Sequence, residues 1–470
     1  MLYSRKEGVY IETLGCPKNI ADSEALKKRL LEAGILLACR PEDAEFIIVN
    51  TCGFIEDAKR ESIEEVLRLS SFKSYSKRKD NSQLLHTPLI AKTATPPPGT
   101  VTSATNNRYL PKLLVMGCLV KRYEKELRKE LPEVDAFFRL NQEEVIAYLK
   151  ANKQQSTATM LRETFTSATE LNNPPYAYIK ISDGCNRRCS FCIIPKIKGP
   201  YFSIEPERII QQAEELISKG YKELILVGQE ITLYGRDRRG FPSLRDLIRK
   251  ITAISGDFWV RLLYLHPASL TEDLLVEIAS NEKVCKYLDI PLQHSEDRIL
   301  RLMRRPGTKE QYRRLIKRIR TLIPNVTIRT TFIVGFPGET EQDFKGLLDF
   351  IKEIEFDRLG VFKYSREEGT AAFNLKNQLS RRTKEKRFAQ IMKLQAEISF
   401  KKNLSMVGKK VRALIDELDK TVAYGRLQSH APEIDGIVII KNPGNLKLGE
   451  FHNIIITGAY DYDLEAIVAK

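Results

Sequence analysis

The sequence predicts an α/β protein built from three parts. Strand and helix patterns alternate over residues 1–152 and again over residues 171–402, whereas residues 405–470 contain short strand patterns alone. Alternating strands and helices favour parallel sheets with right-handed crossovers, and closely spaced short strands are typical of a small β-barrel. We therefore expect a parallel α/β sheet domain, an open partial (β/α)6 barrel and a small C-terminal β-barrel.

The first part contains three short apolar segments, each followed by a helical pattern. Apolar runs of this length are typical of strands buried on both faces of a parallel sheet. We expect strands at residues 10–15, 46–51 and 113–117, and helices that begin near Asp22 and span residues 56–69 and 121–130.

Residues 71–110 interrupt this alternation. The segment is rich in Ser, Thr, Pro and Asn, and it carries six basic residues against one acid, about +5. Such a composition cannot bury enough apolar surface to offset the cost of ordering the chain. We expect a disordered, solvated insertion in a surface loop, with an RNA-contacting tail as the functional alternative.

Six strand patterns follow in the second part, each with a helical stretch behind it. They cover residues 177–182, 223–228, 259–265, 287–292, 327–335 and 358–365. In barrels of this kind the reactive groups lie in the loops at the carboxyl ends of the strands. A long helix over 381–403 then leads to strands expected at 409–418, 436–441 and 452–460.

Composition narrows the class of protein. No run of about eighteen apolar residues occurs and the N-terminal residues lack a secretory pattern, so we expect no membrane span and a cytoplasmic location. The net charge of +15 indicates an anionic partner such as nucleic acid or a ribosome. Eight cysteines in a reducing compartment favour metal binding or catalysis over disulfides.

The densest cysteine motif is Cys185-x3-Cys189-x2-Cys192, directly after a predicted strand. Three thiolates in eight residues can hold a 4Fe–4S cluster and leave one iron open for a ligand. Zinc is the alternative, but a zinc site usually has a fourth ligand at close spacing, and the sequence offers none nearby. The motif predicts a cluster that accepts electrons and also binds a ligand at its open iron.

Three further cysteines, Cys16, Cys52 and Cys118, each follow one of the three N-terminal strands. Parallel strands bring their carboxyl ends to one edge of the sheet, so these thiols should converge there. Coincidence among small buried cysteines is the alternative. We predict a second three-cysteine cluster, and a structural role for Cys39 and Cys285.

Glycine-rich and polar segments end several barrel strands. The turn after the fifth strand has little side-chain bulk, so its backbone can approach a nucleoside, although an ordinary βα loop would have the same composition. Polar side chains after the second strand could contact a cofactor as well. The predicted cofactor-binding residues are Gly335, Phe336, Pro337, Gly338, Gln229, Glu230 and Gln293.

Three other polar residues lie near the same predicted rim. His294 follows the fourth strand, where it could relay a proton or simply form hydrogen bonds within the wall. Arg304 and Arg305 are expected to cover a solvated face of the helix that follows.

The cysteine motif at 185–192, with Phe191 before its last Cys, is similar to the signature of radical S-adenosylmethionine (SAM) enzymes. Apart from residues 71–110, the whole chain resembles the methylthiotransferases, which join a three-cysteine domain, a radical SAM core and a TRAM barrel in this order. The resemblance implies two 4Fe–4S clusters, with SAM as both methyl donor and radical source. It also implies an external electron donor and a sulfur source.

Three motifs resemble one branch of that family, which modifies the β-carbon of an aspartate in the small-subunit ribosomal protein numbered twelve. They are GCPKN at 15–19, YSREEGT at 364–370 and APEIDG at 431–436. From Lys409 to Lys470 the chain has eight basic and nine acidic side chains, a net charge of −1. A barrel that holds RNA should be basic, so this one favours a basic ribosomal protein as partner over tRNA.

Three alternatives differ in the tests that would reveal them. A tRNA adenosine methylthiotransferase would use the same cofactors on a different substrate. An iron–sulfur RNA-binding scaffold would release no deoxyadenosine. A radical enzyme whose second cluster only relays electrons would transfer no methyl group to sulfur.

Overall fold

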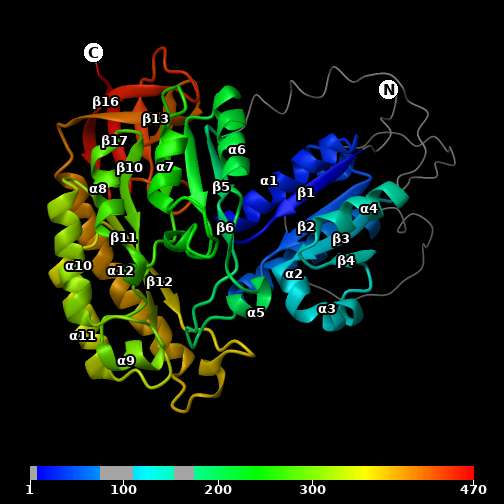
Figure 1. The fold of residues 1–470 in the computed structure, drawn as a ribbon, viewed down its shortest axis with the longest axis horizontal. Helices are drawn as coiled ribbons and strands as arrows, with labels where there is room; N and C mark the ends of the chain where they lie inside the picture. Colours follow the sequence, from blue (N-terminus) through cyan, green and yellow to red (C-terminus); the bar gives the residue numbers. More distant parts are fainter. Residues whose placement is uncertain (1–7, 75–109, 153–173, 470) are drawn as a thin grey trace, which may run out of the picture. The chain divides into compact units, whose positions relative to one another are not determined.

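The computed structural model describes residues 8–74, 110–152 and 174–469, and the chain forms two compact units, residues 1–160 and 161–470 (Figure 1). The predicted insertion at 71–110 lies outside the described residues except at its two ends. The sequence predicted a helix over residues 56–69, but in the structure this helix continues through residues 71–74.

The first unit is a four-stranded sheet between two layers of helices. All strands are parallel, in the order β1 (Val9–Thr13), β2 (Phe46–Thr51), β3 (Lys112–Gly117) and β4 (Ala136–Phe138). Ile47 and Val49 of β2 face one hydrophobic core, to which α2 (Glu56–Ser74) and α3 (Cys118–Glu130) contribute. Ile48 faces the other, formed with α1 (Pro17–Glu32) and α4 (Gln142–Asn152). This alternation explains why β2 is buried along its whole length.

Two helices of this unit begin earlier than the sequence predicted. Pro17 occupies the first turn of α1, where its missing N–H costs nothing, so that helix begins directly after Cys16 rather than near Asp22. Likewise α3 begins at Cys118 itself. Two of the three N-terminal cysteines therefore lie at helix N-termini.

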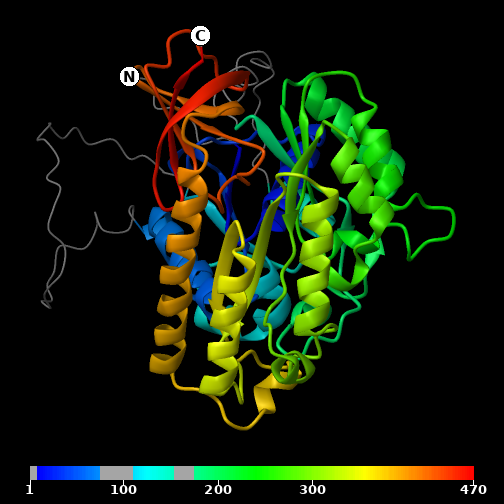
Figure 2. The same ribbon diagram turned by 90° about the vertical axis from the view of Figure 1, so that its left-hand side faces the viewer.

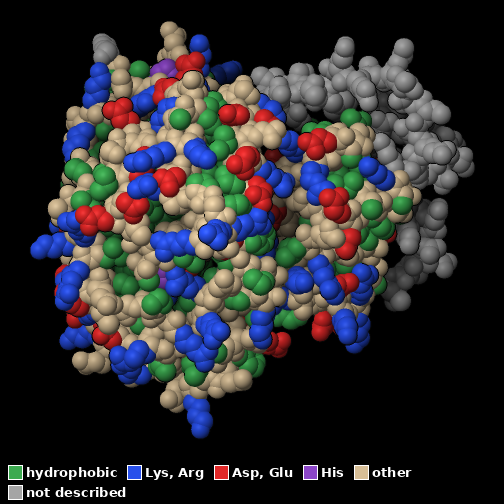
Figure 3. All heavy atoms as spheres, viewed as in Figure 1, with side chains coloured by type: hydrophobic (Ala, Val, Ile, Leu, Met, Phe, Trp, Pro, Cys, Tyr) green, Lys and Arg blue, Asp and Glu red, His purple; other side chains and the backbone are tan. Residues whose placement is uncertain are grey.

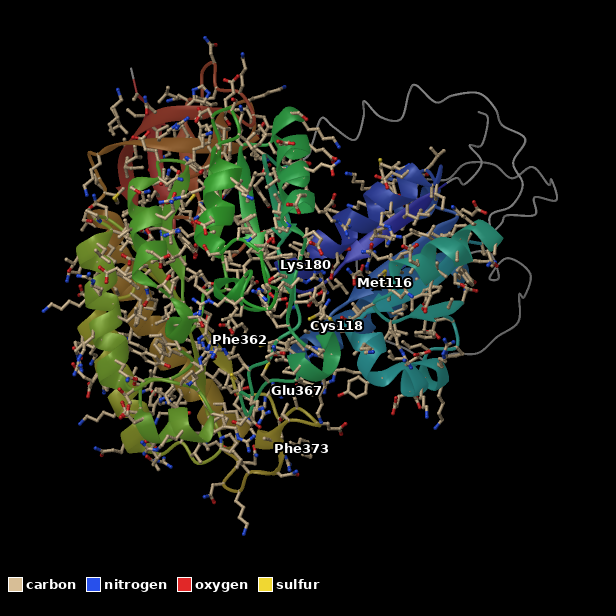
Figure 4. The ribbon with its side chains drawn as sticks, viewed as in Figure 1. Met116, Cys118, Lys180, Phe362, Glu367 and Phe373 are labelled. Carbon is tan, nitrogen blue, oxygen red and sulfur yellow. The ribbon has the colours of Figure 1, made fainter. Side chains whose placement is uncertain are left out.

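The second unit contains the predicted open barrel. Its six-stranded sheet is parallel throughout, in the order β12-β11-β10-β9-β8-β5, and β5 and β12 form its two edges. Lys180 on β5 and Phe362 on β12 mark these edges in Figure 4. The strands are β5 (Tyr176–Lys180), β8 (Glu223–Val227), β9 (Trp259–Leu262), β10 (Val284–Asp289), β11 (Thr327–Val334) and β12 (Arg358–Lys363).

Helices cover the outer face of this sheet (Figures 1 and 2). Ile179, Leu224 and Val260 point outward into the largest hydrophobic core, whereas Glu223 and Arg261, at alternate positions, point the other way. The helices are α5 (Ile194–Lys198), α6 (Pro206–Ser218), α7 (Leu244–Thr252), α8 (Glu272–Ser280), α9 (Asp297–Leu302), α10 (Lys309–Leu322), α11 (Glu341–Ile354) and α12 (Arg381–Leu404).

The C-terminal residues form the expected closed β-barrel, with strand order β13-β14-β15-β17-β16. The strands are β13 (Lys410–Leu418), β14 (Val422–Arg426), β15 (Val438–Lys441), β16 (Phe451–Ala459) and β17 (Leu464–Val468). The sequence analysis missed β14 and β17, each of which is only five residues long. Among the described helices, none is long and apolar enough to cross a membrane.

A buried charge network joins this barrel to the amino ends of the six-stranded sheet. Glu223, which is fully buried, pairs with Arg261 of β9 and with Arg426 of β14, at 2.5 Å in each case. Arg426 also binds Asp416 of β13, and Arg261 donates to the Gln428 carbonyl at 2.7 Å. The barrel and the sheet therefore share one interior at this end of the unit.

The motif at 431–436 belongs to the same junction. Asp435 accepts hydrogen bonds from Tyr287 of β10 at 2.7 Å and from the Ala431 amide at 2.9 Å. Glu433 accepts one from Tyr176 of β5 at 3.1 Å. The two acidic side chains of APEIDG thus fasten a barrel loop to two strands of the sheet.

Candidate iron–sulfur and cofactor sites

The three N-terminal cysteines lie at the carboxyl ends of neighbouring strands. Cys16 precedes α1 and is separated from the end of β1 by two residues, Cys52 follows β2 directly, and Cys118 follows β3 directly (Cys118 is labelled in Figure 4). Cys52 and Cys118 are buried and Cys16 is half-buried. The order β1-β2-β3 places all three at the same edge of the sheet, as the spacing predicted.

Glycines allow the loops that carry these cysteines to pack closely. A Cβ on Gly15, whose φ is +91°, would lie 2.5 Å from the Cβ and 2.9 Å from the Sγ of Cys52. A Cβ on Gly53 would lie 3.0 Å from the carbonyl carbon of Cys118. The loop of Cys16 therefore contacts Cys52, and the loop of Cys52 contacts Cys118.

Asn19 of the GCPKN motif fixes two of these strand ends. Its side-chain amide donates to the carbonyl of Leu14 at 2.8 Å and to that of Thr51 at 3.3 Å. The side-chain amide of Asn50 donates to the backbone carbonyl of Asn19 at 3.2 Å. The motif thus holds the residues next to Cys16 and Cys52 in register.

Burial keeps the Cys52 thiol protonated in the absence of a metal. Desolvation, aided by the nearby Cys16, raises the pKa of Cys52 to about 11. A metal must displace this proton, because the thiolate is the ligand. Cys16 and Cys118 lie where a helix dipole favours negative charge, which suits thiolate ligands.

Gly15→Ala should impair this site while the rest of the fold survives. The added Cβ would overlap Cys52, and a non-glycine residue at a φ of +91° is strained. If each predicted cysteine set holds one cluster, we expect the purified variant to bind about half the iron of the parent. Gly34→Ala is the matched control, because Gly34 also has a positive φ but a Cβ there would meet no described residue within 4 Å. Equal iron in both variants would contradict the close approach described above.

The second cysteine set lies on a tight loop between β6 (Ser182–Asp183) and α5. Gly184, with φ +71°, permits this loop, because a Cβ there would lie 2.0 Å from the Pro200 carbonyl oxygen. The Cys185 amide donates to the Gly199 carbonyl at 3.1 Å, and the Arg187 amide donates to Cys185 Sγ at 3.4 Å. The loop is therefore fixed at its first cysteine.

Ser190 braces the same loop from its middle. Its amide and hydroxyl donate to the carbonyls of Met303 and Leu302, at 2.9 Å and 2.7 Å. Its own carbonyl accepts from the Ala372 amide at 2.7 Å. Ala372 lies two residues past the YSREEGT motif, so that motif supports the segment which holds the cysteine loop.

The three thiols of this loop lie within electrostatic reach of one another. Burial raises the pKa of Cys192 to about 12, and Cys189 and Cys185 add to the effect. Burial also raises the pKa of Cys185, with a contribution from Cys189. In the described ranges no three His, Cys, Asp or Glu side chains are arranged to hold a single metal ion. A 4Fe–4S cluster requires a wider spacing, because each thiolate binds a different iron.

Glu230 has a structural partner in this loop. Its carboxylate accepts two hydrogen bonds from Arg187, at 2.7 Å and 2.6 Å, and one from Ser269 at 2.9 Å. Contact between Glu230 and a cofactor stays a prediction, but the residue already holds the arginine of the cysteine loop. The neighbouring Gln229 has a buried Oε1 with no partner in the described chain.

His266 was missed by the sequence analysis. It follows β9, its Nδ1 accepts the Ala268 amide at 3.2 Å, and its buried Nε2 has no partner among the described residues. Burial, with Arg305 and Arg187 nearby, lowers its pKa to about 2, so the ring is neutral and Nε2 carries the proton. The signal that could have found it was its place just beyond a barrel strand. The unpartnered atoms of Gln229 and His266 fit a polar cofactor at this rim.

Gln293 and His294 follow β10. Gln293 has φ +76°, and its backbone bonds to Thr331 and Ile333 of β11 at 2.8 Å each. His294 is fully buried, and its Nδ1 accepts the Glu296 amide at 3.0 Å. Burial lowers the pKa of His294 to about 3, so the ring is neutral at physiological pH. This favours the wall role over proton relay.

The glycine turn after β11 is held by Glu339, which the sequence analysis did not single out. Its carboxylate accepts the amides of Gly335 and Phe336 at 2.6 Å and 3.0 Å, and Arg387 pairs with it at 2.8 Å. Phe336 is buried. The two amides therefore have partners in the chain, and approach of a cofactor to residues 335–338 stays a prediction.

The expected solvated role is wrong for one of two adjacent arginines. Arg304 is exposed, as predicted. Arg305 is only partly exposed and turns inward, where Nη1 lies 4.0 Å from Cys189 Sγ and Nη2 donates to the Pro291 carbonyl. The prediction for Arg305 was wrong because it assumed that the helix extends through both arginines, whereas α9 ends at Leu302.

Three family models match separate parts of the chain. They are described as the uncharacterized protein family UPF0004, at residues 8–85, the radical SAM superfamily, at 179–351, and the TRAM domain, at 407–468. A solved structure of the radical SAM methyltransferase TsrM from Kitasatospora setae, with cobalamin and a [4Fe-4S] cluster bound, covers 77% of this chain and 76% of its own. Its TM-score of 0.52 at 13% identity shows likeness of fold alone.

Three curated relatives match almost end to end, and each of the three is named ribosomal protein uS12 methylthiotransferase RimO. The protein of Thermodesulfovibrio yellowstonii is 47% identical over 457 residues, 97% of this chain and 98% of the relative. That of Acetivibrio thermocellus is 43% identical, over 98% of both chains. That of Thermotoga maritima is 40% identical, over 97% and 98%. This chain therefore belongs to the uS12 methylthiotransferase RimO family of radical SAM enzymes.

Proposed function

We propose that this protein transfers a methylthio group to the β-carbon of an aspartate in the small-subunit ribosomal protein uS12. The observation that carries the proposal is the near full-length similarity to relatives named for that activity. The radical SAM family implies a 4Fe–4S cluster and SAM. Together they supply a carbon-centred radical able to take hydrogen from an unactivated C–H bond.

We assign that cluster to Cys185, Cys189 and Cys192. Gly184, Ser190 and the Arg187 amide hold the backbone of the loop that carries these three cysteines. Gln229, Gln293 and the turn at 335–338 are proposed to contact SAM from the same rim. Glu230 and Ser269 keep Arg187 in place beside the loop.

We assign a second 4Fe–4S cluster to Cys16, Cys52 and Cys118. Their convergence at one sheet edge and the glycine contacts between their loops support this assignment. The sulfur that is methylated would be held at this site, with an external sulfur source and electron donor completing the cycle. We keep 1–152, 171–402 and 405–470 as the proposed bounds of the three functional parts.

The charge of the second unit bears on the form of the substrate. Exposed basic side chains lie in the segments that follow strands β10 and β12 of the six-stranded sheet, and Figure 3 shows Lys and Arg side chains over the lower half of the view. They include Arg301, Arg304, Arg366, Lys376 and Arg382. RNA phosphates attract such side chains, whereas a free basic protein does not. We therefore favour uS12 within the small subunit, in the cytoplasm, as the substrate.

Mass spectrometry of uS12 and of bulk tRNA, from cells with and without this gene, tests the proposal. We expect the methylthio group to disappear from one uS12 aspartate in the deletion strain while tRNA is unchanged. Complementation with Cys118→Ala should fail, and complementation with Cys39→Ala, at an exposed cysteine, should succeed. Loss of methylthioadenosine from tRNA instead would transfer the proposal to the tRNA branch.

A further inference from the structure

The two arginines beside the radical cysteine loop differ in their electrostatic balance. Arg187 has a buried carboxylate of its own, Glu230, at 2.6 Å. Arg305 pairs with no Asp or Glu in the parts of the chain that the structure describes. Its Nη2 donates to the Pro291 carbonyl, and its buried Nε has no hydrogen-bond partner among the described residues. A partly buried cation without a counter-charge is costly to keep.

Arg305 Nη1 points to the sulfur of Cys189, and the distance between Nη1 and Sγ is 4.0 Å. A thiolate bound to a cluster keeps negative charge on its sulfur, and hydrogen bonds to that sulfur stabilise the more negative, reduced cluster. The bond from Nη2 to Pro291 fixes the guanidinium plane, so the N–H group faces the loop without rearrangement. The backbone amide of Arg305 donates to the Leu300 carbonyl at 2.9 Å, which fixes the backbone from which the side chain extends.

We propose that Arg305 is a positioning residue which raises the reduction potential of the cluster held by Cys185, Cys189 and Cys192. Reduction of that cluster is the step that delivers an electron to the site, so Arg305 makes the step easier for a given electron donor. The inference rests on the proposed assignment of the cluster to these three cysteines. Arg187 cannot substitute, because Glu230 already neutralises its charge.

The test is a redox titration of the reconstituted full-length chain, followed by electron paramagnetic resonance. A background with Cys16→Ala, Cys52→Ala and Cys118→Ala leaves only the radical cluster to titrate. In this background we expect Arg305→Gln to shift the midpoint potential downward and Arg305→Lys to shift it less. Arg304→Gln removes the same charge one residue away, on an exposed side chain, and should leave the potential unchanged.

Equal potentials for the Arg305→Gln and Arg304→Gln proteins would overturn the inference. If Arg305→Gln retains too little cluster to titrate, Arg305→Lys decides, and a potential equal to that of the background would also overturn it. An unchanged potential combined with weakened SAM binding would also overturn the inference, because Arg305 would then act by binding SAM. A background protein without any cluster would overturn the cysteine assignment itself, and is recognised before Arg305 is changed.

Discussion

Cys185→Ala should abolish the release of 5′-deoxyadenosine from SAM and reduce the bound iron by about half. Two remaining thiolates cannot hold a cluster that needs three protein ligands and one open iron. The variant should still fold, because Cys185 is half-exposed and its backbone bond to Gly199 does not involve the side chain. Chromatography of a reaction with SAM and a chemical reductant measures the loss.

Cys39→Ala is the matched control, since Cys39 is exposed and belongs to neither predicted set. It should release deoxyadenosine at the parent rate. Continued release by the Cys185 variant would show that the cluster of the radical core has other ligands.

Glu223→Ala should lower the free energy of unfolding of the second unit by about 3–5 kcal/mol. Removal of this carboxylate leaves Arg261 and Arg426 buried, with side chains 0% and 3% exposed, and short of a counter-charge. Urea unfolding followed by circular dichroism measures the change. Asp257→Ala breaks an exposed pair with Arg412 at the same junction and should cost less than about 1 kcal/mol.

The pH dependence of the same group has a definite sign. Burial raises the pKa of Glu223, but Arg261 and Arg426 more than offset it, so the pKa lies below the ordinary value. A depressed pKa contributes stability that is present above the unfolded pKa and lost as the pH falls through the folded one. The parent should lose this contribution under acid conditions, and Glu223→Ala should not. Equal acid sensitivity of the two proteins would contradict the ionised state of Glu223.

The fold class and the cysteine sets could be predicted because their signals are local. A strand pattern and the residue after it suffice to place Cys16, Cys52 and Cys118 at one sheet edge, since parallel pairing does the rest. Cys185, Cys189 and Cys192 are close in sequence, so no tertiary information was needed. The comparisons support the reaction class and the family that the motifs at 15–19, 364–370 and 431–436 had indicated.

Contacts between distant segments could not be predicted in the same way. Arg305 lies beyond the end of α9, and only the folded chain brings it to Cys189, 116 positions earlier. Glu339 resembles any helix-capping acid until Gly335 and Phe336 are found on its carboxylate. Short strands such as β14 gain their stability from barrel closure rather than from their own composition.

The charged junction at Glu223 also limits how this protein can be recombined. Asp416, Arg426 and the loop at 427–436 complete the interior of the neighbouring sheet, so the C-terminal barrel is not an independent cassette. A barrel transplanted from another protein would remove the second counter-charge of Glu223 unless it also carried an arginine equivalent to Arg426. Engineering of a new substrate preference should therefore leave this charged junction intact and change the outward-facing side of the barrel.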